Sequence, residues 1–139
     1  MSSKINVSKT LIRNNDGEFL IVKKSSDYGW KADKWELPGG KMEEAEDRFE
    51  AAKREIRSEA NMEIDDLENV VRMEIEADET VNCFVLYTDS FSGEVELSEE
   101  HQDYRWISRD EAREVDWHRD AGYIIPVVEN LEYYLERNN

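Results

Sequence analysis

The sequence predicts one α/β domain built on a mixed β-sheet that is covered by helices on both faces. Apolar segments with the period of strands lie on both sides of a single long run of helix formers, residues 41–62, which contains no Pro or Gly. Helical spacing of apolar residues then returns near the C-terminus. At 139 residues, with no repeat, linker or low-complexity segment, the chain has the size of one domain that buries its own core.

Two strands are predicted before the long helix. Residues 5–13 alternate between apolar and polar side chains, and residues 19–22 form an apolar run typical of a strand buried on both faces. The turn residues between them, 14–17 (NNDG), predict a hairpin that pairs the two strands. A short extended piece is predicted at residues 34–37.

Three further strands are predicted after the long helix. Residues 70–76 alternate, which indicates a half-exposed strand. Residues 81–87 are more continuously apolar and predict a central strand, and residues 103–107 predict a last short strand after a turn at Ser92 and Gly93.

The C-terminal part predicts two helices. Ser108 begins the first one in a capping-box arrangement, in which Glu111 reaches back to its backbone. Apolar residues at helical spacing over 124–135 predict the second, in which Pro126 is tolerated only in the first turn.

The charge balance excludes some partners. Thirty-four acidic and eighteen basic side chains give a net charge of −16. Such a surface repels phosphate backbones and anionic lipids, so we expect neither a nucleic-acid polymer nor a membrane as partner. Because the acids are spread over the chain, adaptation to high salt is slightly favoured over an ordinary acidic protein.

The cysteine count and the N-terminal residues indicate a soluble cytoplasmic protein. Cys83 is the only cysteine and lies in an apolar run, so we expect a buried small side chain, not a disulfide or a nucleophile. Residues 1–9 contain no apolar signal segment, and no stretch reaches membrane-spanning length.

The long helix is predicted over residues 44–60, and it carries two faces. One face is apolar and predicts a contact with the core: Phe49, Ala52, Ile56 and Ala60. Glu55 and Glu59 lie four residues apart on a neighbouring arc, where their repulsion weakens a helix by about 0.2–0.5 kcal/mol. A divalent cation removes that penalty, because carboxylates are natural ligands of Mg²⁺.

Residues 35–62 resemble the signature of the Nudix (MutT-like) hydrolases, G-x5-E-x7-R-E-U-x-E-E-x-G-U, in which U is a bulky aliphatic residue. Seven positions match: Gly40, Glu46, Arg54, Glu55, Ile56, Glu59 and Met62. Two depart from it. Ser58 replaces a glutamate, and Asn61 replaces a glycine that ends the helix, where Asn is the next best residue.

The resemblance implies a Nudix-type α/β/α sandwich over residues 1–139, with the signature at 40–62. It also implies an enzyme that cleaves a diphosphate bond in a nucleoside di- or triphosphate, or in another nucleoside diphosphate linked to a group X. The cofactor that it implies is Mg²⁺ or Mn²⁺, which compensates the charge of the phosphates.

The resemblance also implies roles for the signature residues. Glu59 and the carbonyl of Gly39 are expected metal ligands, Glu55 is a general base or a further ligand, and Ser58 contributes at best through water. Arg54 is expected to orient the carboxylates, with Glu46 and Gly40 in support. The alternatives are a structural ion pair of Glu55 with Arg54 or Arg48, and a helix-dipole role for Glu46.

A distal carboxylate often completes the metal site of this family. The matching loop offers Glu100 first and Glu99 second, although a solvated acidic loop explains both equally well. His101 is a candidate base, but a lone surface histidine more often has no such role.

Substrate contacts are expected from lysines and loop aromatics. Phosphate charge is met by Lys23, then Lys41 or Lys24, although lysines at strand ends are usually only solvated. Candidates for the nucleobase are Tyr28, Trp30, Trp117 and Asp116. Packing in a core or an interface is the alternative for each ring.

Three functions stay open at this point. An active metal-dependent nucleotide hydrolase is favoured, because the clustered glutamates have no purpose in a mere binder. Ser58 motivates the alternative of a weakly catalytic or non-catalytic nucleotide-binding sensor of Nudix fold. No sequence feature speaks for a structural interaction domain, and none decides between a monomer and a homodimer.

Overall fold

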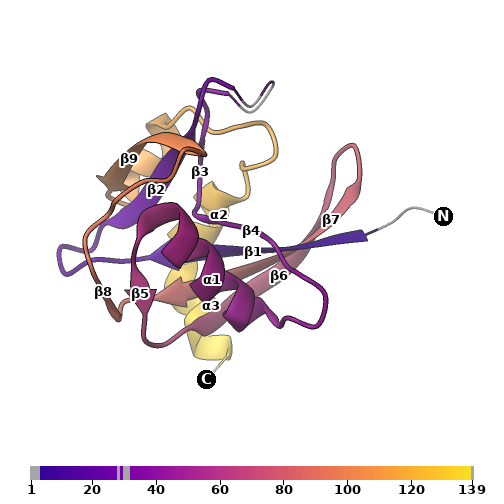
Figure 1. Cartoon of the computed structure of the whole chain (residues 1–139). Coiled ribbons are helices and arrows are strands. Elements are labelled where there is room, and N and C mark those ends of the chain that lie inside the picture. The colour runs from indigo at the N-terminus through magenta and orange to yellow at the C-terminus, as the bar shows by residue number, and fades with distance from the viewer. Residues whose placement is uncertain (1–3, 28, 30–31, 139) are drawn as a thin grey trace.

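The computed structural model describes residues 4–27, 29 and 32–138, which form three β-sheets and several helices (Figure 1). The strands and helices follow in this order: β1 (Lys4–Ile12), β2 (Phe19–Lys24), β3 (Trp35–Glu36), β4 (Gly39–Lys41), α1 (Arg48–Ala60), β5 (Glu63–Ile64), β6 (Glu68–Glu76), β7 (Thr80–Thr88), β8 (Phe91–Ser92), β9 (His101–Ile107), the 3₁₀ helix η2 (Asp110–Glu114), α2 (Ile124–Glu129) and α3 (Leu131–Arg137).

The largest sheet is mixed, as predicted, with strand order β4-β1-β7-β6. β1 runs parallel to β7, whereas β4 pairs antiparallel with β1 and β6 antiparallel with β7. The central position predicted for residues 81–87 is confirmed, because β7 has a partner on each edge. A second sheet has the order β3-β2-β9, and β5 and β8 form a small third one.

Alternate side chains of the central strands face two separate cores. Leu11 of β1 and Val85 of β7 pack with the C-terminal helices, while their neighbours Ile12 and Leu86 pack with α1. Figure 1 shows α1 on one face of the sheet and α2 and α3 on the other. The expected α/β/α sandwich is therefore confirmed.

The predicted hairpin between the first two strands is wrong. The turn itself forms, with Gly17 at φ +77° and the Asn14 side chain accepting from the backbone N–H of Glu18. The strands then separate after a single bridge between Arg13 and Phe19. Both edges of β1 are occupied by β4 and β7, so β2 pairs instead with β3 and β9.

Helix α1 starts four residues later than predicted. Ala45 has a positive φ of +68°, which the helix cannot include, and Asp47 caps the helix in a reciprocal capping box with Glu50. The C-terminus follows the prediction: Asn61 has left-handed backbone angles, and its N–H donates to the carbonyl of Arg57. Three residues of the predicted core face are buried, while Phe49 is only half-buried.

The C-terminal helices are shorter than predicted. The capping contacts of Ser108 and Glu111 form, but they start only the 3₁₀ helix η2. The single helix predicted over 124–135 is divided at Asn130 into α2 and α3, and Pro126 lies in the first turn of α2, as required.

No helix in the described part of the chain is long and apolar enough to cross a bilayer. Cys83 is a free, buried thiol, as expected for a small core residue.

Candidate functional site

The two glycines of β4 bring the backbone close to α1 and β1. Gly39 has φ +139°, and a Cβ there would lie 2.0 Å from the carbonyl oxygen of Ser8. A Cβ on Gly40 would lie 3.0 Å from the carboxylate of Glu55. Gly39 therefore requires glycine, because its φ is positive and any side chain would meet the backbone of β1. A side chain on Gly40 would instead displace the carboxylate of Glu55.

Glu59 is the most deeply buried carboxylate of α1. Only 2% of its surface is exposed, and its Oε2 accepts a hydrogen bond of 2.9 Å from the N–H of Gly39. Burial raises its pKa to about 8; Lys9 and the Gly39 N–H oppose the rise, and the nearby Glu55 and Glu36 add to it. The position therefore favours a cation that would stabilise the ionised form.

Glu55 occupies a more polar environment. Its Oε1 accepts from Nη1 of Arg54 at 2.9 Å. Arg54 also binds Glu46 with two nitrogens, at 2.8 and 2.9 Å, and donates to the carbonyl of Lys41. The hydrogen bonds from Arg54, with one from the Glu43 backbone, lower the pKa of Glu46 to about 2. Arg54 thus holds both glutamates and the β4 backbone in one arrangement.

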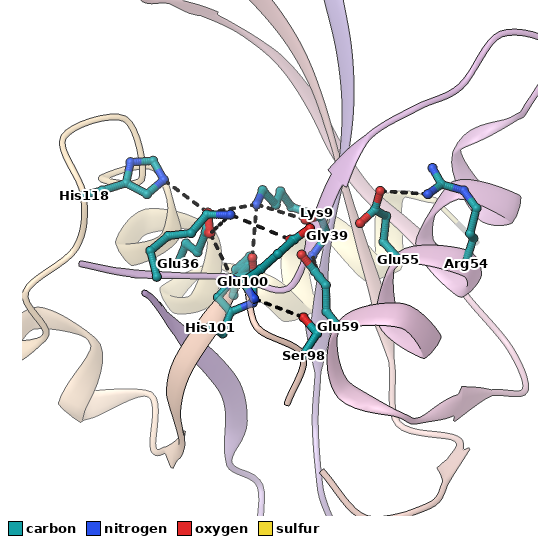
Figure 2. Close-up of polar contacts among 12 residues, drawn as sticks. Lys9, Glu36, Gly39, Arg54, Glu55, Glu59, Ser98, Glu100, His101 and His118 are labelled. Atoms are coloured by element: carbon teal, nitrogen blue, oxygen red, sulfur yellow. Dashed lines mark hydrogen bonds and ion pairs between the residues drawn. The ribbon is translucent and has the colours of Figure 1, made fainter. Parts of the chain in front are cut away.

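Two residues around the start of β9 bring further possible metal ligands close to Glu59. One carboxylate oxygen each of Glu59 and Glu100 and one ring nitrogen of His101 lie within 4.8 Å of one another, and we call these residues the Glu59 cluster (Figure 2). Carboxylate oxygens and imidazole nitrogens are ordinary ligands of divalent cations. The Nδ1 of His101 is also buried with no hydrogen-bond partner among the described residues. This donor set fits a metal ion.

The surface position assumed for His101 is wrong. Its side chain has no exposed surface, because the ring packs at the start of β9 against Glu36. Its Nε2 lies 3.4 Å from Oε2 of Glu36, which is itself buried in β3.

Glu36 is the centre of a buried charge network that the sequence analysis missed. Its Oε1 accepts from Lys9 at 3.1 Å and lies 3.7 Å from Nε2 of His118, and its Oε2 lies 3.6 Å from Nζ of Lys24. Burial opposes ionisation of Glu36, but Lys9, His101 and Lys24 outweigh it and hold its pKa well below the usual value.

All three hydrogen bonds that Nζ of Lys9 can donate are made within this network. Its Nζ also donates to the backbone carbonyls of Leu37, at 3.2 Å, and Gly39, at 3.4 Å. Burial lowers the pKa of Lys9, but Glu36 and Glu59 raise it more, so the net change is upward. One sequence signal was available: Lys9 has the same parity as Val7 and Leu11, so the strand carries a charge on its apolar face.

The site opens into a cavity of about 540 Å³. Its lining includes charged residues and the two glycines of β4: Lys9, Lys24, Glu36, Gly39, Gly40, Lys41, Glu55, Glu59 and Glu100. The lining also includes apolar strand residues, the loop between β6 and β7 and a segment before α2: Ile5, Val7, Val81, Ala77, Asp78, Glu79, Arg119 and Asp120. In the view of Figure 2, Arg54 and Glu55 lie on one side of Gly39 and Glu36 on the other.

Ser58 lies outside this cavity. It is exposed on α1 and lines a second cavity of about 560 Å³ together with Glu99 and Glu100. Of the two acids expected in this loop, Glu100 therefore reaches the Glu59 cluster as well, whereas Glu99 lines only the second cavity among those described.

The substrate-contact candidates are divided. Lys41 lines the cavity beside Glu59. Lys23 is not among the residues that line this cavity, and its Nζ lies 5.8 Å from the centre of the Trp35 ring. Tyr28 and Trp30 lie outside the described residues.

The other two base-contact candidates are held by neighbouring groups. Asp116 forms an ion pair with Lys34 at 2.9 Å, and Nε1 of Trp117 donates to the carbonyl of Ala112.

Comparison with known proteins agrees with the geometry. The family model described as NUDIX domain matches residues 4–127. The chain belongs to the NUDIX family. A nucleoside triphosphatase NudI from Enterobacter sp. (strain 638) is 32% identical over 117 residues, which cover 76% of this chain and 83% of that protein. The protein is accordingly a Nudix-type pyrophosphohydrolase.

Solved structures support the same assignment of the Nudix fold. A MutT protein from Methanosarcina mazei Go1 superposes with a TM-score of 0.84 at 27% identity, covering 99% of this chain and 98% of the other. The E. coli ORF135 protein gives a TM-score of 0.78 at 26% identity, with 95% and 91% covered.

Proposed function

We propose that this Nudix hydrolase acts on a nucleoside triphosphate and requires Mg²⁺ or Mn²⁺. The observation that carries the proposal is the Glu59 cluster, whose two glutamates line a cavity large enough for a nucleotide. The similarity to proteins named nucleoside triphosphatase supports the substrate class. A nucleoside diphosphate linked to another group is the alternative within the same chemistry.

The residues proposed to hold the metal are Glu59 and Glu100. Glu55 and the carbonyl of Gly39 are proposed as further ligands. A bound divalent cation supplies charge that compensates the phosphates and lowers the pKa of a bound water. Glu59 suits this role because it is buried with a backbone N–H as its direct partner and no lysine or arginine within ion-pair distance among the described residues.

The chain's own residues have separate tasks in the reaction. Water attacks a phosphorus atom, the bond from that phosphorus to the bridging oxygen breaks, and the bridging oxygen leaves with the other product. Glu55 accepts the proton of the water, and Arg54 fixes the carboxylate through its 2.9 Å hydrogen bond. Positioning of this kind depends on Gly40, which leaves room for the carboxylate.

Lysines that line the cavity are proposed to bind the phosphates. Lys24 and Lys41 both line the cavity. Lys9 is not proposed for this role, because its three protons are engaged by Glu36 and two carbonyl oxygens. The nucleoside is proposed to lie against the apolar lining residues Val7 and Val81.

The test is a panel of nucleoside triphosphates, diphosphates and nucleotide sugars, assayed for phosphate and pyrophosphate release with Mg²⁺ and with Mn²⁺. We expect turnover of at least one triphosphate and a loss of about 10³-fold in kcat for Glu59→Gln, because a metal contributes several kcal/mol to such transition states. The matched control is Glu63→Gln, an exposed carboxylate paired with Arg57 after the end of α1, and we expect it to keep full activity.

A nucleotide-binding sensor is the second candidate. It is favoured by one observation: Ser58 replaces a family carboxylate and lines the other cavity. If every member of the panel binds without turnover at any metal concentration, the sensor replaces the enzyme. If Ser58→Glu then raises turnover or lowers the metal concentration needed, the enzyme is retained.

A further inference from the structure

We propose that His101 is a nitrogen ligand of the metal in this chain and offsets the carboxylate that Ser58 lacks, so that the site prefers Mn²⁺, Co²⁺ or Zn²⁺ over Mg²⁺. The inference rests on the metal dependence of the proposed function. It concerns a residue that lies outside the signature and joins the site only through the fold.

The position of His101 is fixed by its backbone and its ring. It begins β9 opposite Lys24, and its backbone N–H donates to the carbonyl of Ser98 at 3.3 Å. Its imidazole has no exposed surface. The ring is therefore held in place beside Glu59 and Glu100 at the start of a paired strand. It loses little conformational freedom on binding a metal.

The contact with Glu36 favours one tautomer of the neutral imidazole. A carboxylate only accepts hydrogen bonds, and Glu36 is held by Lys9 and Lys24, so the tautomer that fits is the one with the proton on Nε2, 3.4 Å from Glu36. Nδ1 then carries the lone pair. It is buried and has no partner in the part of the chain that the structure describes, and such an acceptor is costly unless something binds it.

This arrangement is typical of metal-binding histidines. A ligating imidazole usually donates its other N–H to a carboxylate, which fixes the ring and makes the ligating nitrogen more basic. Glu36 has that relation to His101, and one carboxylate oxygen each of Glu59 and Glu100 lies within 4.8 Å of a ring nitrogen of His101.

The serine at position 58 and the imidazole of His101 together determine which metal ion the site prefers. With an exposed hydroxyl in place of a family carboxylate, the donor set loses an oxygen and keeps an imidazole. Oxygen-only sites suit Mg²⁺, whereas imidazole favours first-row transition ions. We therefore expect Mn²⁺ to bind more tightly than Mg²⁺. The ratio of the two affinities should fall when His101 is replaced.

The test uses pulsed electron paramagnetic resonance on the untagged full chain loaded with Mn²⁺ alone. The sequence contains two histidines, His101 and His118, so an imidazole nitrogen coupled to the metal has only two sources. His118 is the matched control, since it is also buried and lies 3.7 Å from the same carboxylate of Glu36.

We expect nitrogen coupling in the wild type and in His118→Gln, and its loss in His101→Gln. Calorimetric titration should show Mn²⁺ affinity lowered by about tenfold or more in His101→Gln, with a smaller loss for Mg²⁺. The proposal is overturned if the wild-type spectrum lacks nitrogen coupling, which needs no variant to fold, or if His118→Gln abolishes it.

These outcomes separate the two proposals. Turnover of a triphosphate by a wild-type enzyme whose Mn²⁺ spectrum has no nitrogen coupling removes His101 from the site and leaves the enzyme. Nitrogen coupling in a protein that turns over no nucleotide keeps the metal site and removes the hydrolase.

Discussion

Glu36 and Glu59 are both almost completely buried, with 3% and 2% of their surfaces exposed, yet their pKa values move in opposite directions. Glu36 has two lysines and two histidines within 3.7 Å, and its pKa falls. Glu59 has a backbone N–H as its direct partner, and its pKa rises to about 8. The protein itself supplies the counter-charges of Glu36, whereas Glu59 is the carboxylate that we propose binds an external cation.

The difference assigns the two carboxylates different roles. Glu36 is a structural anion that holds Lys9 and, through it, the carbonyls beside the glycine pair. Glu59 is a buried carboxylate with a raised pKa, and such groups are common at functional sites, which fits its proposed role as a metal ligand. Substituting Glu36 and Glu59 one at a time tests this division of roles.

The largest effect is expected from Glu36→Gln. Removing the carboxylate leaves Lys9 buried without its counter-charge, and breaking a buried pair in this way lowers the free energy of unfolding by about 3–5 kcal/mol. Urea unfolding monitored by tryptophan fluorescence measures it. Glu74→Gln breaks the exposed pair with Lys4 and should change stability by less than about 1 kcal/mol. Equal effects of the two variants would contradict a structural role for Glu36.

The next effect concerns pH and metal-free protein. The pKa of Glu59 is raised in the folded state, so its contribution to stability is fully present below the unfolded-state pKa near 4.5 and is lost as the pH rises through about 8. Wild-type protein in chelator should therefore lose stability between pH 5 and pH 8, and Glu59→Gln should lose less. Parallel curves for the two proteins would show that Glu59 ionises normally in the fold.

The pKa of Glu36 is lowered, so its contribution has the opposite sign. It is present above pH 4.5 and is lost only as the solution becomes strongly acidic. The descending limb of wild-type stability below pH 4 should therefore be weaker in Glu36→Gln.

A smaller effect is expected from Gly40→Ala. The added Cβ would lie 3.0 Å from the Glu55 carboxylate, which is the movable end of a side chain, so the fold should persist while the carboxylate shifts. We expect kcat to fall by about tenfold to a hundredfold with stability changed by about 1 kcal/mol. Gly122→Ala is the control, because a Cβ there meets nothing within 4 Å among the described residues. Unchanged kcat in Gly40→Ala would separate Glu55 from the reaction.

The smallest effect concerns salt. The net charge of −16 destabilises the folded state, because its acidic groups repel one another. Added salt screens this repulsion. We expect thermal stability to rise modestly between 0.1 and 1 M KCl in wild type and in Glu59→Gln alike. A fall in melting temperature over that range would argue against adaptation to high salt.

The sequence predicted the features that depend on local patterns. The central strand at residues 81–87, the left-handed C-cap at Asn61 and the capping contacts of Ser108 all follow from neighbouring residue types. The signature motif also predicted that Glu55 and Glu59 would lie at one site, since both belong to one helix face.

The sequence did not predict features that depend on pairing between distant strands. The Glu36 network joins β1, β2, β3 and β9, and its partners are up to 82 positions apart in sequence, as for Glu36 and His118. The hairpin prediction failed for the same reason, because the edge of β1 is taken by β7, which lies far along the chain. Burial of His101 could not be derived either, since it depends on where Glu36 lies.

The most direct test of the division between Glu36 and Glu59 is calorimetric titration of the metal-free protein with Mn²⁺ near pH 7, in buffers of different ionisation enthalpy. Because Glu59 must lose its proton to bind a cation, we expect the wild type to release protons on binding and Glu59→Gln to bind far more weakly without that release. Equal affinity and equal proton release in the two proteins would mean that the cation does not bind at Glu59.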